Sequence, residues 1–234
     1  MLSWFIPPKK VEVTGGSHVY FDTHTTYISR VCVVFAVDEA YYALVCGSCI
    51  SKDKPFAPSK ADAFIYNGKI LIGNVVDGVW ESGEWGKDFG IVRLRSDYVT
   101  AKPWKVNDIP LAGVISSVQL LEMLKQYRTL MFGVAGVPDF ELVEASTVQA
   151  DDLASEEGAR GRRSVSTRRR KGFRLIIKRR TDLYAPVIGD PVTVVAGENH
   201  ILVGMLVSHA FQVHGTYIVQ TLDWFLESKW FKLI

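Results

Sequence analysis

Most of this sequence is divided into short segments of β-branched and aromatic residues, separated by Gly, Asn, Asp and Pro. Val, Ile, Tyr, Phe and Thr suit the pleated, half-buried surface of a strand, whereas the separating residues favour turns. Many short strands at close spacing are typical of a sandwich or a barrel. The pattern therefore predicts an all-β protein, with strands at 27–37, 41–45, 63–66, 69–76, 90–94, 130–134, 173–177, 192–195, 200–207 and 216–219.

Two segments have apolar residues at helical spacing instead. Residues 117–127 follow a Ser that can cap a helix, and residues 221–233 form a closing helix with Thr221 as its expected N-cap. We therefore expect an all-β body with a helix at the C-terminus.

Size and cysteine content restrict the class of protein further. The chain has 234 residues, 48% of them hydrophobic, which is enough for one all-β domain or two small ones. Three cysteines leave at least one thiol unpaired within the chain, which favours a reducing compartment. We find no basic leader with a cleavage site and no apolar run of roughly 20 residues. We expect an intracellular, cytoplasmic or virion protein with no membrane partner and no cofactor.

The charge is distributed unevenly along the chain. Eleven of the residues 160–180 are Arg or Lys and none is acidic, so a net charge of +2 leaves 2 − 11 = −9 on the remainder. Residues 150–172 are also poor in apolar side chains, which predicts a long mobile loop inserted between two strands. The basic cluster that we expect to bind a polyanion consists of Arg160, Arg162, Arg163, Arg168, Arg169, Arg170 and Lys171.

Several partners fit this Arg-rich loop. Clustered Arg and Lys neutralise phosphates without regard to sequence, so RNA is the first candidate and DNA is a second. An acidic protein surface, a nuclear localisation role and a solvated loop without a partner are the alternatives.

Four short stretches, taken in chain order, carry most of the remaining information. Tyr-Ala-Leu-Val-Cys-Gly-Ser-Cys places Ser48 and Cys49 after a strand, and Lys-Asp-Phe-Gly-Ile-Val-Arg-Leu places Asp88 before the next. Gly189-Asp190-Pro-Val leads into a later strand. Ile-Leu-Val-Gly-Met-Leu-Val-Ser-His-Ala at 201–210 precedes Gly-Thr-Tyr-Ile-Val and the closing helix.

In this order the four stretches resemble the landmarks of the trypsin-like serine proteases. The resemblance implies two six-stranded antiparallel β-barrels of the chymotrypsin type with a C-terminal helix. The first barrel would occupy residues 1–104 and the second residues 105–234, with the boundary near 103–111 and the Arg-rich loop in the second. The separation of Cys32 and Cys49 is close to that of a family disulfide, so the resemblance allows this bridge.

The same resemblance implies that the catalytic machinery is degenerate. Ser48 stands where the family has its histidine, and the motif Gly-Asp-Ser-Gly-Gly-Pro-Val has lost Ser-Gly-Gly at Gly189 and Asp190. Asp88 matches the orienting aspartate; it either accepts a hydrogen bond from Ser48 or bonds local backbone N–H groups. Asp190 matches a residue that pairs with a freed N-terminus, but with a start at Met1 we expect it to cap a loop.

The leading hypothesis is therefore a pseudoprotease, a non-catalytic binding or structural module with a protein partner, such as a viral capsid-associated or RNA-binding protein. The first alternative is an active hydrolase with relocated residues. It would use Cys46 or Cys49 as nucleophile and a base from the five histidines, which are His18, His24, His200, His209 and His214. The second is an unrelated β-barrel nucleic-acid-binding protein.

Overall fold

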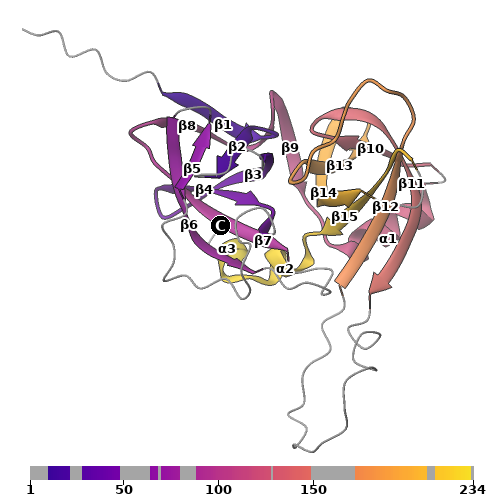
Figure 1. Cartoon of the computed structure of the whole chain (residues 1–234). Coiled ribbons are helices and arrows are strands. Elements are labelled where there is room, and N and C mark those ends of the chain that lie inside the picture. The colour runs from indigo at the N-terminus through magenta and orange to yellow at the C-terminus, as the bar shows by residue number, and fades with distance from the viewer. Residues whose placement is uncertain are drawn as a thin grey trace, which may run out of the picture.

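The computed structural model describes residues 10–21, 28–47, 64–67, 70–79, 88–127, 129–148, 172–209 and 214–232. In these residues the chain is mostly β and forms two lobes of strands, with short helices beside them (Figure 1). The all-β prediction is therefore confirmed.

The first lobe is a closed barrel of six antiparallel strands. Around the barrel the order is β2 (His18–Phe21), β3 (Ile28–Val37), β4 (Ala40–Val45), β7 (Phe89–Leu94), β6 (Ile70–Val79) and β5 (Phe64–Asn67). A turn of Asp38 and Glu39 joins β3 to β4, and both residues have positive φ angles, of 45° and 64°. Tight hairpin turns need this conformation, because it matches the twist of the strands.

Strand β3 is buried on both faces, which explains its apolar run at residues 31–37. Val31 and Val34 lie in the core of the first barrel, whereas Cys32, Val33 and Phe35 lie in a second cluster with residues of the second lobe. A register shift between Val31 and Val33 turns the strand from one face to the other. One face of β3 thus forms the contact between the lobes.

The second lobe is the larger part of a nine-stranded sheet. Pairing between β14 and β15 closes six of its strands into a ring. In order, these are β10 (Met131–Val134), β11 (Val137–Val148), β12 (Gly172–Arg179), β15 (Thr216–Thr221), β14 (Asn199–His209) and β13 (Pro191–Ala196). The prediction of two six-stranded antiparallel barrels is confirmed.

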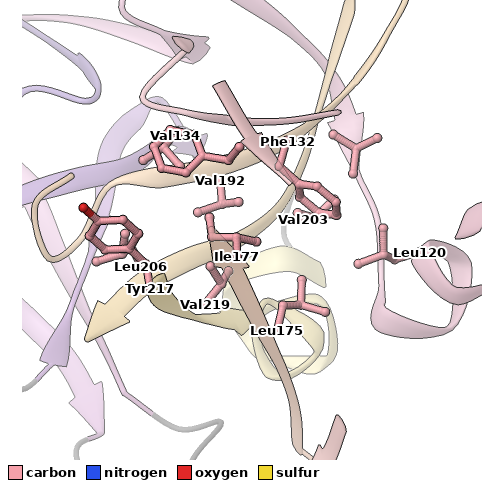
Figure 2. Close-up of a cluster of buried hydrophobic side chains, with 12 residues drawn as sticks. Leu120, Phe132, Val134, Leu175, Ile177, Val192, Val203, Leu206, Tyr217 and Val219 are labelled. Carbon is pink, nitrogen blue, oxygen red and sulfur yellow. The ribbon is translucent and has the colours of Figure 1, made fainter. Parts of the chain in front are cut away.

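The core of the second lobe is apolar and continues under helix α1 (Ser117–Gln126). Figure 2 shows Phe132, Val192 and Val203 of the strands and Leu120 of the helix, all almost fully buried. Ser116 caps the helix, since its hydroxyl accepts from the Gln119 N–H while the Gln119 side chain accepts from the Ser116 N–H. The predicted helix is confirmed.

Three further strands extend the nine-stranded sheet to the first barrel. Strand β1 (Val11–Gly15) pairs in parallel with β8 (Val99–Val106), and β9 (Ile109–Val114) pairs in parallel with β14. Strands β8 and β9 form a hairpin with its turn near Asn107. This turn falls within the stretch where we expected one barrel to give way to the other.

The C-terminus differs from the single helix that we predicted. It forms two short helices, α2 (Asp223–Glu227) and α3 (Lys229–Lys232), which begin after Leu222 rather than at Thr221. Ser228 separates them, and its hydroxyl donates to the Phe225 carbonyl. Both helices lie against the first barrel, where the Trp230 Nε1–H donates to Asp77 Oδ2 at 2.8 Å (Figure 1).

Across the described ranges no helix has the length and apolarity that crossing a bilayer requires.

Candidate functional site

The turn from Val187 to Pro191 lies at the contact between the barrels, where the resemblance implied a nucleophile motif. Asp190 is fully buried here. Its Oδ2 accepts from the Tyr184 hydroxyl and from the Val187 N–H, both at 2.8 Å. The expectation that Asp190 caps a loop is confirmed by the second of these bonds.

Arg30 of β3 supplies the opposite charge from the first barrel. Its Nε lies 3.4 Å from Asp190 Oδ1, and its Nη1 donates to the Tyr184 hydroxyl at 2.6 Å. The guanidinium also lies over the Tyr184 ring, 5.5 Å from its centre. Arg30, Asp190 and Tyr184 therefore form one buried polar network, which we call the interbarrel clamp.

Burial dominates the electrostatics of the clamp. It raises the pKa of Asp190 to about 6, although Arg30 and the Val187 N–H both act in the opposite direction. Burial also raises the pKa of the Tyr184 hydroxyl, and the Asp190 carboxylate adds to this effect. Arg30 Nε and Asp190 Oδ1 make no hydrogen bond within the described residues, so they interact as charges only.

Gly189 lets the turn fit directly against β3. Its φ of 90° suits glycine, and a Cβ there would collide with the Arg30 carbonyl oxygen. The Arg30 N–H donates to the Ile188 carbonyl at 3.0 Å, so the two barrels are also joined through backbone.

The backbone N–H groups of this turn are largely engaged inside the protein. The Gly189 N–H donates to the Leu206 carbonyl at 2.8 Å, and the Asp190 N–H donates to the Val187 carbonyl at 3.0 Å. The Val187 N–H is engaged by Asp190, and Pro191 has no N–H. An oxyanion hole needs backbone donors that point at the substrate. In this turn these three donors point elsewhere.

Asp88 directly precedes β7, is half-buried and lies close to Cys46, which directly follows β4. The Cys46 thiol donates to Asp88 Oδ2 at 3.2 Å, and the Asp88 N–H donates to Gln220 Oε1 of β15 at 3.1 Å. The sequence offered Ser48 or the local backbone as the partner of this carboxylate. Ser48 lies outside the described residues, and among those described one partner of the carboxylate is Cys46, which the sequence did not link to Asp88.

The two cysteines of the described residues are both buried thiols. Cys32 is not in a disulfide, so the bridge to Cys49 that the resemblance allowed is not present, and its Sγ lies 3.8 Å from the Gly204 carbonyl oxygen. Burial raises the pKa of Cys32, as does the nearby Asp190 charge.

Several predicted positions lie outside the described residues. They include Ser48, Cys49, His24 and the basic cluster Arg160, Arg162, Arg163, Arg168, Arg169, Arg170 and Lys171. The insertion that contains this cluster joins β11 to β12, whose ends pair at Val148 and Gly172.

The described histidines occupy separate places. His18 is on β2, where burial and the Arg30 charge lower its pKa. His200 is on β14 with Nδ1 3.3 Å from Thr193 Oγ1, and burial lowers its pKa. His214 is exposed beside β15. Among the residues that the structure describes, no group of acidic, His and Cys side chains could hold a metal ion.

Sequence reasoning missed Arg30, Tyr184 and Gln220 as parts of this region. Arg30 did carry a signal, because it is the one charged residue in the apolar stretch 28–37. A charge in a strand buried on both faces needs a partner. The identity of that partner, 160 residues away along the chain, depends on the tertiary fold.

The comparisons with known proteins concern the fold. No family model and no curated protein matches the sequence. Among solved structures the chain is similar to an alpha-lytic protease homolog, N4, with a TM-score of 0.52 and 13% identity, over 93% of this chain and 96% of that one. It is also similar to protease A of Thermobifida fusca, with a TM-score of 0.54 and 13% identity, over 93% and 95%. These neighbours are serine proteases of the chymotrypsin fold, and the chain shares their two-barrel architecture.

Proposed function

We propose that this protein uses a chymotrypsin-like fold to bind a partner and does not cleave peptides. The observation that carries the proposal is the state of the turn at residues 187–191. Its backbone donors at Val187, Gly189 and Asp190 are engaged within the protein, and Asp190 is buried in the interbarrel clamp. Acyl transfer needs a nucleophile and a stabilised oxyanion, whereas this turn contains no Ser, Thr or Cys and three of its backbone N–H groups are engaged within the protein.

Asp88 supports the same conclusion. An orienting carboxylate acts by accepting a hydrogen bond from the catalytic base. Here one donor to the carboxylate is the Cys46 thiol, and by the family resemblance Ser48 stands where the base would be. A hydroxyl has no useful proton affinity near neutral pH.

The competing hypothesis is a hydrolase with a relocated thiol nucleophile. The protease neighbours favour it, but at 13% identity their likeness concerns the fold. Cys46 is completely buried, and its thiol donates a hydrogen bond to Asp88. Neither property suits a nucleophile that must meet a substrate.

General peptide and ester substrates test the proposal. We expect turnover by the purified protein to equal that in buffer, with protease A of Thermobifida fusca as the positive control. Turnover that disappears in Cys46→Ala or Cys49→Ala would instead support the relocated hydrolase.

We further propose that the Arg-rich insertion provides the binding function, with RNA as the first partner and an acidic protein such as a capsid shell as the second. Outside residues 160–180 the formal charge is −9, so this segment can locally reverse the repulsion of a polyanion. A viral capsid-associated or RNA-binding role fits a protein that combines this turn at residues 187–191 with an Arg-rich insertion.

A further inference from the structure

A polar groove lies on the outer surface of the first barrel, away from the interbarrel clamp. It has a volume of about 350 Å³, and its lining includes Gly73, Asn74, Arg93, Arg95, Ser96 and Asp97. Strands β6 and β7 supply Gly73, Asn74 and Arg93, and the turn after β7 supplies the rest. We call this feature the β7 groove.

Two arginines give the groove its positive charge. Arg93 and Arg95 are exposed and two residues apart along an extended chain, so they point to the same side. Their neighbours Val92 and Leu94 point into the barrel core. Within the described part of the chain neither arginine forms an ion pair, which leaves both guanidinium groups available to an anion.

The groove is held in shape by hydrogen bonds and ring contacts. The Arg95 N–H donates to the Ile72 carbonyl, while the Arg95 carbonyl accepts from the Tyr98 and Val99 N–H groups. The Arg95 guanidinium lies 4.8 Å from the centre of the Tyr98 ring. A stacked arginine loses less conformational entropy when it binds a phosphate. Arg95 is thus partly ordered before any ligand arrives.

Asn74, Ser96 and Asp97 complete the lining with an amide, a hydroxyl and a carboxylate. Asn74 is the cross-strand partner of Arg93, so its amide lies on the same face. Ser96 and Asp97 stand at the other end of the turn and can accept hydrogen bonds from a ligand. Asp97 would repel a plain phosphate, whereas it would bind a ligand that carries hydroxyl or amino donors beside its phosphates.

We propose that the β7 groove binds single-stranded RNA, with Arg93 and Arg95 on successive phosphates and Asp97 accepting from a ribose 2′-hydroxyl. Positions two apart on a strand are separated by roughly 6.6 Å, which lets the two side chains reach neighbouring phosphates of one chain. Ribose hydroxyls are what distinguish RNA from DNA at a protein site. The inference rests on the proposed function only in taking RNA as the partner, and it holds whether or not the chain cleaves peptides.

The experiment measures binding of a fluorescent single-stranded RNA to the full chain over a range of salt concentrations. The test variant is Arg93→Ala with Arg95→Ala, and the control is Lys125→Ala with Lys232→Ala, which removes two exposed charges outside the β7 groove and outside residues 160–180. We expect the slope of log affinity against log salt to shrink by about 1.4 in the test variant, at ~0.7 per lost phosphate contact. The control should keep the wild-type slope.

Two further arms identify the ligand. A DNA strand of the same sequence should bind more weakly than RNA, and Asp97→Ala should reduce that difference. Inorganic pyrophosphate should not compete at concentrations at which RNA saturates, since it lacks the hydroxyl donors. Photo-crosslinking with thiouridine-substituted RNA should label a peptide within residues 72–98.

Equal slopes in the test and control variants, or crosslinks confined to other segments, would overturn the inference while leaving the Arg-rich insertion as the RNA site. Competition by pyrophosphate, or equal affinity for RNA and DNA, would reject the assigned role of Asp97 and the preference for RNA. No RNA binding by the wild type at low salt would reject both RNA assignments, but not the proposal that the chain is non-catalytic.

Discussion

The guanidinium of Arg30 and the carboxylate of Asp190 face one another across the contact between the two barrels, with 3.4 Å between Nε and Oδ1. Arg30 comes from the first barrel and Asp190 from the turn that leads into β13. Tyr184 bridges the two by hydrogen bonds to both. The pair therefore couples the turn at residues 187–191 to the position of the first barrel.

The titration of Asp190 should make stability depend on pH. Its pKa is raised from 3.8 to about 6 by burial, so between these values the folded state holds a proton that the unfolded state has lost. The stability from this proton is fully present below about pH 4 and is lost as pH rises through about 6. We compare the unfolding free energy of the wild type with that of Asp190→Asn. The difference, wild type minus variant, should fall by roughly 3 kcal/mol between pH 4 and pH 7.

Urea denaturation at a series of pH values measures this difference. Asp182→Asn is the control, because Asp182 is 91% exposed and pairs with Arg179 at the surface. The titratable His18 and Cys32 side chains and the charged Arg179 face the clamp from neighbouring elements, so each variant is compared with wild type at every pH. A pH-independent difference would show that Asp190 does not titrate in this range.

Removing one member of the clamp should cost more than removing both. Arg30→Met leaves Asp190 buried without its cation, and we expect a loss of about 3 kcal/mol in unfolding free energy at pH 7. Adding Asp190→Asn removes the unpaired charge, so the double variant should regain on the order of 1–2 kcal/mol over Arg30→Met. Additive losses in this double-mutant cycle would mean that the two residues act independently.

The packing of the turn against β3 can be measured with a pair of glycines. Gly189→Ala should destabilise by more than about 3 kcal/mol, because positive φ costs roughly 1–2 kcal/mol and the new Cβ meets the Arg30 backbone. Gly197→Ala is matched for positive φ, at 64°, but its Cβ meets nothing within 4 Å. Gly197→Ala should therefore lose only the roughly 1–2 kcal/mol that positive φ costs. Equal losses would show that the turn and β3 are not in close contact.

Deletion of residues 160–171 tests the Arg-rich insertion. The segment lacks the apolar residues that a core needs, so we expect the thermal midpoint to change by less than about 3 °C. RNA affinity and its salt dependence should both fall, because up to seven cationic contacts are removed. Replacement by a Gly-Ser segment of equal length is the control for loop length, and RNA binding equal to wild type in either variant would contradict the assignment.

The strands could be predicted from sequence because alternation, turn residues and apolar runs are local properties, whereas the two-barrel arrangement was implied only by the resemblance to the trypsin-like proteases. The pairing of the strands was harder to predict from the sequence. The parallel pairs β1–β8 and β9–β14 join segments far apart, and nothing in their composition specifies a partner. The predicted start of the closing helix was wrong. Thr221 remains in β15, and its hydroxyl donates to Asp223 Oδ2 rather than capping the helix.

The candidate site was predicted less well than the fold. The expectation that Asp190 caps a loop is confirmed, because its carboxylate accepts from the Val187 N–H. Its ion pair with Arg30 and the bond from Cys46 to Asp88 are tertiary contacts between residues 160 and 42 positions apart. Sequence patterns identify a buried charge that needs a partner, but only the fold shows which residue is near enough to provide it.

The most direct test of the non-catalytic proposal is covalent labelling with a fluorophosphonate, which reacts with a serine activated by a base and an oxyanion hole. The protein is incubated with excess reagent and its intact mass is measured, with protease A of Thermobifida fusca treated in parallel. We predict no gain in mass for this protein under conditions that label the control completely. A stoichiometric adduct on one serine, absent after heat denaturation, would contradict the account.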